Sequence, residues 1–243
     1  MKTSIPTTHE AKIPAWQQWL EHPEKVWVHW PIFHIHLWLG MAAGLYIFVM
    51  SVSGSAIVYR NSLEGSSDPR SPVFRVVEWL VDLHENLLLG RTGRAINGIG
   101  ALCLTFLCLT GAILWWPGIA HWRRSLRLNW SLSFARLNWD FHNALGFWFF
   151  LFVLLWGISG IYFAFPYVFN TFVDFLQPPS TSGNVPFGDL ALLWLANLHF
   201  GRFSWFTKAV WTLVGLLPAV LSFTGMFMCC HRLLIRKGAP LSM

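Results

Sequence analysis

Two stretches of the chain share one pattern, and this pattern decides the fold. The first, Trp79–Gly111, reads WLVDLHENLLLGRTGRAINGIGALCLTFLCLTG, and the second, Trp194–Gly225, reads WLANLHFGRFSWFTKAVWTLVGLLPAVLSFTG. In both, a W-L-x-x-L-H segment is followed by Gly-Arg and then by an apolar run that ends in Thr-Gly. The pattern aligns His84 with His199, Gly90-Arg91 with Gly201-Arg202, and Thr110-Gly111 with Thr224-Gly225.

A second pattern interleaves with the first. It reads H-x3-G-x12-S-G and occurs from His36 to Gly54 and again from His142 to Gly160, without a gap in either copy. Internal repeats that place matched polar residues in apolar segments are a common construction of membrane proteins. The two patterns together predict a duplicated two-helix unit in which a histidine introduces each helix.

The composition is that of a membrane protein. Of the 243 residues, 55% are hydrophobic and only 12% are charged, and the 16 Trp and 21 Phe suit interfacial belts or a planar cofactor. The net charge of +6 forms no basic stripe away from the apolar runs, so we expect no nucleic-acid partner. The four cysteines lack metal-site spacing and are expected to pack. The first apolar run starts near His36, after a long polar segment, and is expected to be an anchor rather than a cleaved signal.

We predict an all-α protein with four membrane spans in an up-down bundle, because each apolar run has the roughly 20 residues needed to cross a bilayer core. The spans are residues 36–59, 95–116, 141–165 and 208–230, joined in part by loops at 60–72 and 167–185. Pro218 predicts a kink in the last span. Residues 73–89 and 187–200 are predicted to form two interfacial amphipathic helices, the first of which ends at a Gly90–Gly93 turn.

The repeats divide the chain into four parts. These are a polar N-terminal tail (1–33), a first two-helix repeat (34–118), a basic loop (119–140) and a second two-helix repeat (141–236). The loop carries four arginines within a short distance of two spans, which predicts that it faces the cytoplasm. Both termini are then cytoplasmic, and the amphipathic helices lie on the opposite side of the membrane.

The four repeated histidines fall on two levels of such a bundle. His36 and His142 introduce spans one and three at the cytoplasmic side, whereas His84 and His199 precede spans two and four at the other side. Alternate helices of a four-helix bundle are diagonal neighbours, so each level can bring two imidazoles face to face. Two opposed histidines in an aromatic interior are the axial ligands of a six-coordinate b-type haem. We therefore predict two haems b.

Small and basic residues accompany these histidines. Gly40 and Gly146 lie one helical turn after their histidines and leave room for a flat ring. Arg91, Arg94 and Arg202 are candidates for pairing with haem propionates. The glycines of the four Ser/Thr-Gly pairs also make room at the far helix ends, although helix packing alone accounts for such pairs equally well.

The histidines also have simpler interpretations. A single histidine near the end of a span is more often an interfacial hydrogen-bonding group than a ligand. His34 is a rival of His36, whereas we expect no ligand role for His9, His22, His29, His121 and His231. A metal-transport function is less well supported, because no acidic residue lies within any span to join an ion path.

At these motifs the chain resembles the PepSY-associated transmembrane family, which includes bacterial inner-membrane proteins that reduce siderophore-bound iron. The motifs are H-L-W-L-G with its S-G, L-H-E-N-L-L-L-G with L-T-G-A-I-L-W-W-P-G, F-H-N-A-L-G with I-S-G-I-Y-F-A-F-P, and L-H-F-G-R-F with F-T-G; together they cover residues 34–236. The resemblance implies a four-span bundle, two b-type haems and electron transfer across the membrane toward a ferric chelate. Many relatives carry a substantial periplasmic domain between spans one and two, whereas here only residues 60–72 separate span one from the amphipathic helix.

We therefore expect a dihaem electron-transfer protein in the lipid of a bacterial inner membrane, with the amphipathic helices on the periplasmic side and a ferric siderophore as candidate substrate. No G-x-G-x-x-G fingerprint follows a strand, so the donor is a quinol or a separate reductase. Bis-histidine iron has no open position, which implies outer-sphere transfer. Alternatives are a quinol-linked cytochrome b that serves another partner, and a cofactor-free membrane scaffold or accessory subunit.

We also predict a shallow pocket over the outer haem, with an aromatic rim formed by Trp79, Trp194, Phe203 and Trp205. The arginines beside this rim either attract an anionic chelate, hold the propionates or only anchor the helices to lipid phosphates.

Overall fold

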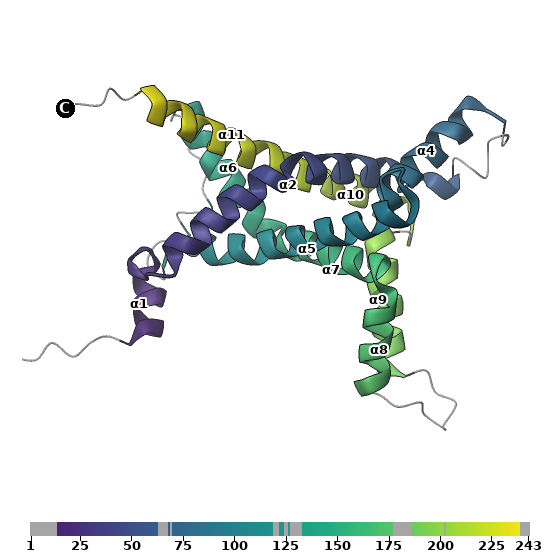
Figure 1. The fold of residues 1–243 in the computed structure, drawn as a ribbon, viewed down its shortest axis with the longest axis horizontal. Coiled ribbons are helices and arrows are strands. Elements are labelled where there is room, and N and C mark those ends of the chain that lie inside the picture. Colours follow the sequence, from purple (N-terminus) through teal and green to yellow (C-terminus); the bar gives the residue numbers. More distant parts are fainter. Residues whose placement is uncertain are drawn as a thin grey trace, which may run out of the picture.

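The protein is all-helical in the part of the chain that the structure describes. This computed structural model describes residues 14–62, 68, 70–118, 122–123, 126, 133–176, 186–201 and 203–238. Its elements (Figure 1) are α1 (Ala15–Glu21), the 3-10 helix η1 (Pro23–Lys25), α2 (His29–Ile57), α4 (Pro72–Asn86), α5 (Gly90–Trp115), α6 (Phe134–Trp148), α7 (Phe150–Ala164), α8 (Pro166–Leu176), α9 (Phe187–Phe200), α10 (Trp205–Gly215) and α11 (Leu217–Gly238).

Three helical segments are long and apolar enough to cross a membrane, and a bent pair makes four if it is one span. The three are residues 29–62, 90–115 and 205–234, and the bent pair is α6 with α7. In Figure 1, α2, α5, α7 and α11 lie along one another, while α4, α8 and α9 gather at one end and α1 lies at the other. Within this bundle α5 packs mainly against α7, and α2 packs mainly against α11. The chain is thus a helical protein with several candidate membrane spans.

The first span begins earlier than the sequence patterns predict. Helix α2 starts at His29 rather than at His36, and α1 also lies within the predicted polar tail. Pro31 does not stop α2, because it occupies the first helical turn, where a missing backbone N–H breaks no helical hydrogen bond.

The predicted single span 141–165 is two helices in the structure. Helices α6 and α7 are separated at Phe149 and bent by 67°, and α6 starts at Phe134, inside the predicted basic loop. The break follows Gly146 and falls within four consecutive aromatic residues, all of which have lower helix propensity than leucine or alanine. The start of α6 contains an ion pair between Arg136 Nε and Asp140 Oδ1 at 3.2 Å, one helical turn apart.

The kink predicted at Pro218 is confirmed as a break between α10 and α11. Proline has no N–H to donate, and the helical ladder is interrupted next to it. The hydroxyl of Ser51 bridges the interruption, because it donates to the Gly215 carbonyl at 2.5 Å and accepts from the Ala219 N–H at 3.0 Å. A polar side chain of α2 thereby satisfies main-chain groups of the neighbouring span, as a kinked membrane helix requires.

The two shorter helices expected at one end of the bundle are present, with corrected boundaries for the first. Helix α9 has the predicted bounds, whereas α4 ends at Asn86, and Leu87 and Leu88 form the turn with φ of 54° and 61°. The predicted Gly90–Gly93 turn is instead the first turn of α5. Gly93 is needed there because a Cβ would collide with the carbonyl oxygen of Asn86. Helix α8 occupies part of the predicted loop 167–185, and Pro166 is its first residue.

Candidate functional site

Each of the four repeated histidines contacts the hydroxyl of a Ser/Thr-Gly pair on another helix. In every case the histidine atom is Nδ1. The contacts are His36 of α2 with Thr110 of α5 (2.8 Å), His142 of α6 with Thr224 of α11 (2.8 Å), His84 of α4 with Ser53 of α2 (3.1 Å), and His199 of α9 with Ser159 of α7 (2.6 Å). The sequence patterns identified all eight residues but gave no indication that they pair in this way.

The glycines of three of these pairs leave space for the imidazoles themselves. A Cβ added at Gly54 would lie 2.7 Å from Cε1 of His84, and one at Gly111 would lie 3.2 Å from Cε1 of His36. The corresponding distance from Gly225 to Cε1 of His142 is 3.4 Å. The fourth glycine, Gly160, faces the Cβ of Ala101 instead. The Ser/Thr-Gly pair therefore combines a hydroxyl partner with clearance for the ring.

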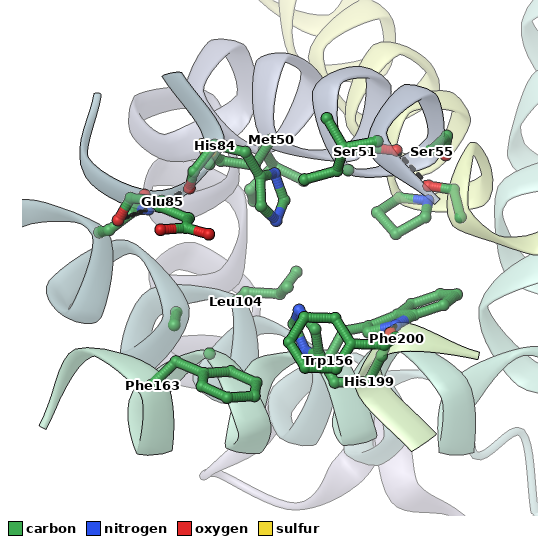
Figure 2. A pocket seen from close by; sticks show the side chains of 18 of the residues that line it. Met50, Ser51, Ser55, His84, Glu85, Leu104, Trp156, Phe163, His199 and Phe200 are labelled. Atoms are coloured by element: carbon green, nitrogen blue, oxygen red, sulfur yellow. Dashed lines mark hydrogen bonds between the residues drawn. The ribbon is translucent and has the colours of Figure 1, made fainter. Parts of the chain in front are cut away.

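His84 and His199 face each other across a cavity of about 380 Å³. Their ring centroids are 6.5 Å apart with 53° between the ring planes, and Figure 2 shows both rings pointing into the space between α4 and α9. The surrounding wall is mainly apolar and includes Met50, Leu104 and Phe163. The structure thus brings together the two histidines that the sequence placed on one level.

Side chains of the cavity wall donate hydrogen bonds to the main-chain carbonyls of these two histidines. Asn97 Nδ2 donates to the His84 carbonyl at 2.5 Å, and Tyr46 orients Asn97 by donating to its Oδ1 at 2.9 Å. On the other side, Trp156 Nε1 donates to the His199 carbonyl at 3.3 Å. Carbonyl groups in the last turn of a helix have no partner within the helix, and these side chains of the bundle satisfy them. The sequence patterns had given Asn97, Tyr46 and Trp156 no role.

The environment of His84 favours a neutral imidazole. Desolvation by the surrounding side chains lowers its pKa to about 4, and a backbone hydrogen bond to Met50 only partly opposes this. At neutral pH the ring therefore carries no charge, and a neutral imidazole is the form that binds metals.

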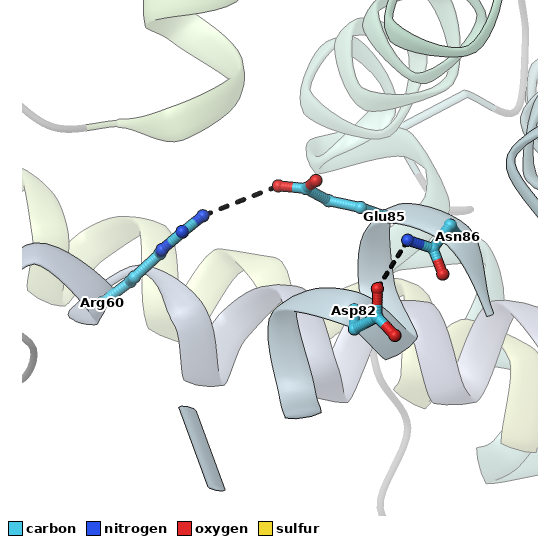
Figure 3. A network of polar contacts seen from close by, with 4 residues as sticks. All are labelled: Arg60, Asp82, Glu85 and Asn86. Carbon is cyan, nitrogen blue, oxygen red and sulfur yellow. Dashed lines mark hydrogen bonds and ion pairs between the residues drawn. The ribbon is translucent and has the colours of Figure 1, made fainter. Parts of the chain in front are cut away.

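Charged groups lie on one side of the cavity wall. Arg94, one of the residues predicted to bind a cofactor, lines the cavity together with Arg60 and Glu85. Arg60 Nη1 lies 3.7 Å from Glu85 Oε1 (Figure 3), and the same view shows Asn86 donating to Asp82 at 2.6 Å. The sequence patterns had placed Arg60 in a loop with no site role.

The other two arginines that were predicted to bind a cofactor are Arg91 and Arg202. Arg91 is exposed and is not among the residues that line it, and Arg202 lies outside the described residues. The predicted rim aromatics Trp79, Trp194 and Trp205 are likewise at least half-exposed and do not line it.

The fourth predicted rim residue, Phe203, stacks on Trp194 with 6.2 Å between ring centroids. The aromatic lining of the cavity comes instead from Tyr46, Trp156, Phe163, Phe200 and Trp211.

The predicted second pair, His36 and His142, lies on α2 and α6. Beside them a Cβ at Gly146 would meet no atom within 4 Å, and one at Gly40 would meet only Leu107 Cδ2 at 3.8 Å. Space therefore exists next to both glycines.

The rival ligand His34 has different surroundings from His36. Its ring packs against Trp30, with 4.4 Å between centroids, and against Phe33. His36, by contrast, has the hydroxyl contact that all four repeated histidines share.

Comparison with known proteins identifies the family. The sequence model of the PepSY-associated TM region matches residues 65–186, which are 122 of the 243 residues. An uncharacterized protein of Pseudomonas aeruginosa is 31% identical over 87 residues, which make up 35% of this chain and 21% of that relative. The matched segment thus spans about a fifth of the relative's length. No solved structure matches the chain. Because the family model covers half of the sequence, including α4, α5, α6 and α7, this protein belongs to the PepSY-associated transmembrane family.

Proposed function

We propose that this protein is a b-type dihaem electron-transfer protein of a bacterial inner membrane. The observation that carries the proposal is the facing pair His84 and His199, with 6.5 Å between ring centroids. Two metal–imidazole bonds of about 2 Å each, together with half of each ring, span about 6 Å. The separation of the two rings would therefore allow both histidines to bind one haem iron.

The rest of the cavity also suits a haem. Its volume of about 380 Å³ is within the usual range of small-molecule sites, and its lining is largely apolar and aromatic. Haem carries two carboxylates, and Arg94 and Arg60 in the wall are the kind of residue that binds them. In this proposal His84 and His199 hold the iron, and Arg94 pairs with a propionate.

The second haem would be held by His36 and His142, with Gly40 and Gly146 leaving room beside it. His36 and Ser53 both lie on α2 and belong to different levels. Seventeen residues of α-helix separate them, which is about 25 Å at 1.5 Å per residue. A bilayer core is about 30 Å thick, so the two sites would lie near opposite faces of the membrane.

The proposal includes the duplicated two-helix architecture, the interfacial placement of α4 and α9, and cytoplasmic termini. Bound haem supplies reversible one-electron chemistry at each level. The chain's own histidines would bind the iron, its aromatic side chains would keep water from the cofactor, and its arginines would neutralise the carboxylates. Electrons from a quinol or a separate reductase would enter at the His36 level and leave at the His84 level by outer-sphere transfer.

The acceptor in this proposal is a periplasmic ferric chelate, with iron as the substrate. The cavity wall at the His84 level carries Arg94, and Arg60 beside Glu85, and an arginine that is not neutralised by a propionate or by Glu85 would attract an anionic acceptor. A second candidate is a cytochrome b that passes electrons to another protein. It is favoured by the short connection between α2 and α4, which has too few residues for a substrate domain between these helices.

Haem stoichiometry tests the proposal. The purified protein is expected to contain two haems b per chain in a pyridine haemochrome assay and to show a sharp α-band on reduction. Alanine in place of His36, His84, His142 or His199 should remove one haem, whereas His34→Ala, the matched control, should keep both. A colourless wild-type protein would overturn the proposal and favour the scaffold function.

A further inference from the structure

We propose that Ser53, Thr110, Ser159 and Thr224 are positioning residues that fix the tautomer and aim of the four histidines. This inference rests on the proposed haem function, because it concerns the ligands of the iron. In it, each hydroxyl accepts a hydrogen bond from Nδ1–H of its histidine and leaves Nε2 as the atom that binds the metal.

The position of the hydroxyl proton carries the argument. Each hydroxyl lies in an α-helix and contacts the carbonyl oxygen four residues earlier. The partners are Val49 for Ser53 (2.8 Å), Phe106 for Thr110 (2.8 Å), Leu155 for Ser159 (2.6 Å) and Val220 for Thr224 (2.8 Å). A hydroxyl has one proton, and a carbonyl can only accept. The proton is therefore directed at the carbonyl, and the hydroxyl oxygen offers a lone pair to the histidine.

The histidine must then be the donor. If Nδ1 carried no proton, it would face the hydroxyl lone pair at 2.6–3.1 Å with no hydrogen between the two atoms. The neutral ring is thus held as the Nδ1–H tautomer, with its Nε2 lone pair available for a metal.

All four residues that carry these hydroxyls are buried. The exposed fraction is 2% for Ser53, 4% for Thr110, 0% for Ser159 and 5% for Thr224. Water cannot replace a hydroxyl at such positions, so a histidine that lost its partner would keep an unsatisfied N–H. Serine and threonine in apolar helices often bond only to their own helix. Bonding of that kind does not account for a histidine Nδ1 at all four hydroxyls.

Removal of one of these hydroxyls is expected to change the affinity of the site for the metal and the reduction potential of the bound haem. Removal of a group that orients a metal ligand typically lowers metal affinity by about 10–100-fold. A ring that donates from Nδ1 is also a stronger donor at Nε2, and this favours ferric over ferrous iron. Loss of the hydroxyl should therefore raise the reduction potential. A tenfold change in the preference for ferric over ferrous iron corresponds to about 59 mV for one electron.

The test uses Thr110→Val and Ser159→Ala, one for each proposed haem level. The purified full-length variants are titrated electrochemically, and haem per chain and the low-spin electron paramagnetic resonance signal are recorded. We expect a raised potential for one haem, an altered signal from changed ring orientation, or loss of that haem. Thr110→Ser should restore wild-type values, because it returns the hydroxyl.

Thr105→Val is the matched control. Thr105 lies on the same helix as Thr110 and bonds the Ala101 carbonyl at 2.9 Å, but no histidine among the described residues contacts it. It should keep both haems and both potentials. Should Thr110→Val fail to fold, Thr224→Val tests the same level.

Failure of this inference is distinguishable from failure of the proposed function. Wild-type potentials, signals and haem content in Thr110→Val and Ser159→Ala would overturn the positioning role, while two haems in the wild-type protein would leave the proposed function intact. A wild-type protein without haem would overturn both.

Discussion

The glycines beside the histidines allow a matched test of how closely the imidazoles are held. A Cβ at Gly54 would lie 2.7 Å from Cε1 of His84, whereas one at Gly225 would lie 3.4 Å from Cε1 of His142. Carbon atoms in contact prefer about 3.5–4.0 Å. Gly54→Ala should therefore push the His84 ring about 0.7 Å further than Gly225→Ala pushes the His142 ring, which is the difference between 3.4 and 2.7 Å.

The two substitutions should consequently change stability in opposite directions. Overpacking of a close contact costs about 1–3 kcal/mol. Alanine in place of glycine within a helix gains about 0.5–1 kcal/mol. Gly225→Ala, with little overpacking, should be neutral or slightly stabilising, whereas Gly54→Ala should lose up to about 2.5 kcal/mol after that gain. The two variants should then differ by about 1–3 kcal/mol, or about 2–12 °C in thermal midpoint.

The assay is thermal unfolding of the detergent-purified variants at one heating rate, followed by tryptophan fluorescence. A second variant isolates the contact, because His84→Ala removes the ring that Gly54→Ala displaces. In the His84→Ala background, Gly54→Ala should no longer destabilise, so the two substitutions are non-additive. Equal midpoints for the two glycine variants, or additive effects in the double variant, would refute the placement of His84 against Gly54.

Four further predictions concern the space beside Gly146, the break between α10 and α11, the electron acceptor and the membrane topology. Gly146→Leu enters space where a Cβ meets no atom within 4 Å, so the chain should fold normally but lose one haem; retention of both haems would show that this space is not used. Ser51→Ala leaves the Gly215 carbonyl and the Ala219 N–H without their bridge and should lower stability by about 1–3 kcal/mol in thermal unfolding. Arg94→Gln should slow reoxidation of the dithionite-reduced protein by a ferric siderophore when the rate is expressed per bound haem, and an unchanged rate per haem would place the acceptor elsewhere. A reporter active only in the periplasm should be silent when fused at residue 130 and active at residue 181, both outside the described residues; the reverse would invert the electron path.

Sequence patterns were sufficient for helix α9 because both of its ends carry local signals. Pro186 precedes its first residue, and Gly201 ends it with a φ of 61°, a conformation that glycine adopts without strain. The end of α4 was misplaced because leucines, not glycines, adopt the left-handed conformation there. Leucine rarely does so, and the turn is therefore a product of tertiary packing, where Gly93 lets α5 approach the last residue of α4.

The limits of the helices that form the candidate spans were hard to predict from the sequence. Hydropathy marks where a helix is apolar enough for lipid, but helices continue beyond that stretch, as α2 does from His29. The bend between α6 and α7 has no proline, and the aromatic run at Phe149 is apolar on both sides of the break. An average of hydrophobicity cannot detect such a change in direction. The break before Pro218 was predictable, because proline lacks the N–H that the helix requires.

The sequence patterns marked the histidines of the candidate site but not their contacts. The repeats identified four histidines and four Ser/Thr-Gly pairs, and spacing alone assigned the histidines to two levels. It could not show which hydroxyl faces which imidazole, since that depends on how the helices rotate against one another. Asn97 and Trp156 were missed for the same reason: each acts on the main chain of a different helix, and no local pattern marks them.

The spacing between a histidine and the hydroxyl on the same span shows how one helix serves both levels. His36 and Ser53 are 17 residues apart, which is about 4.7 turns at 3.6 residues per turn. Their side chains therefore point about 100° apart around α2, and this lets His36 meet Thr110 of α5 while Ser53 meets His84 of α4. His142 and Ser159 have the same separation, yet the bend between α6 and α7 lies between them, and both hydrogen bonds are present. The bend changes the direction of the span without loss of either contact. The two halves of the chain thus share the pairing of each histidine with its hydroxyl, rather than the straightness of the helix that carries them.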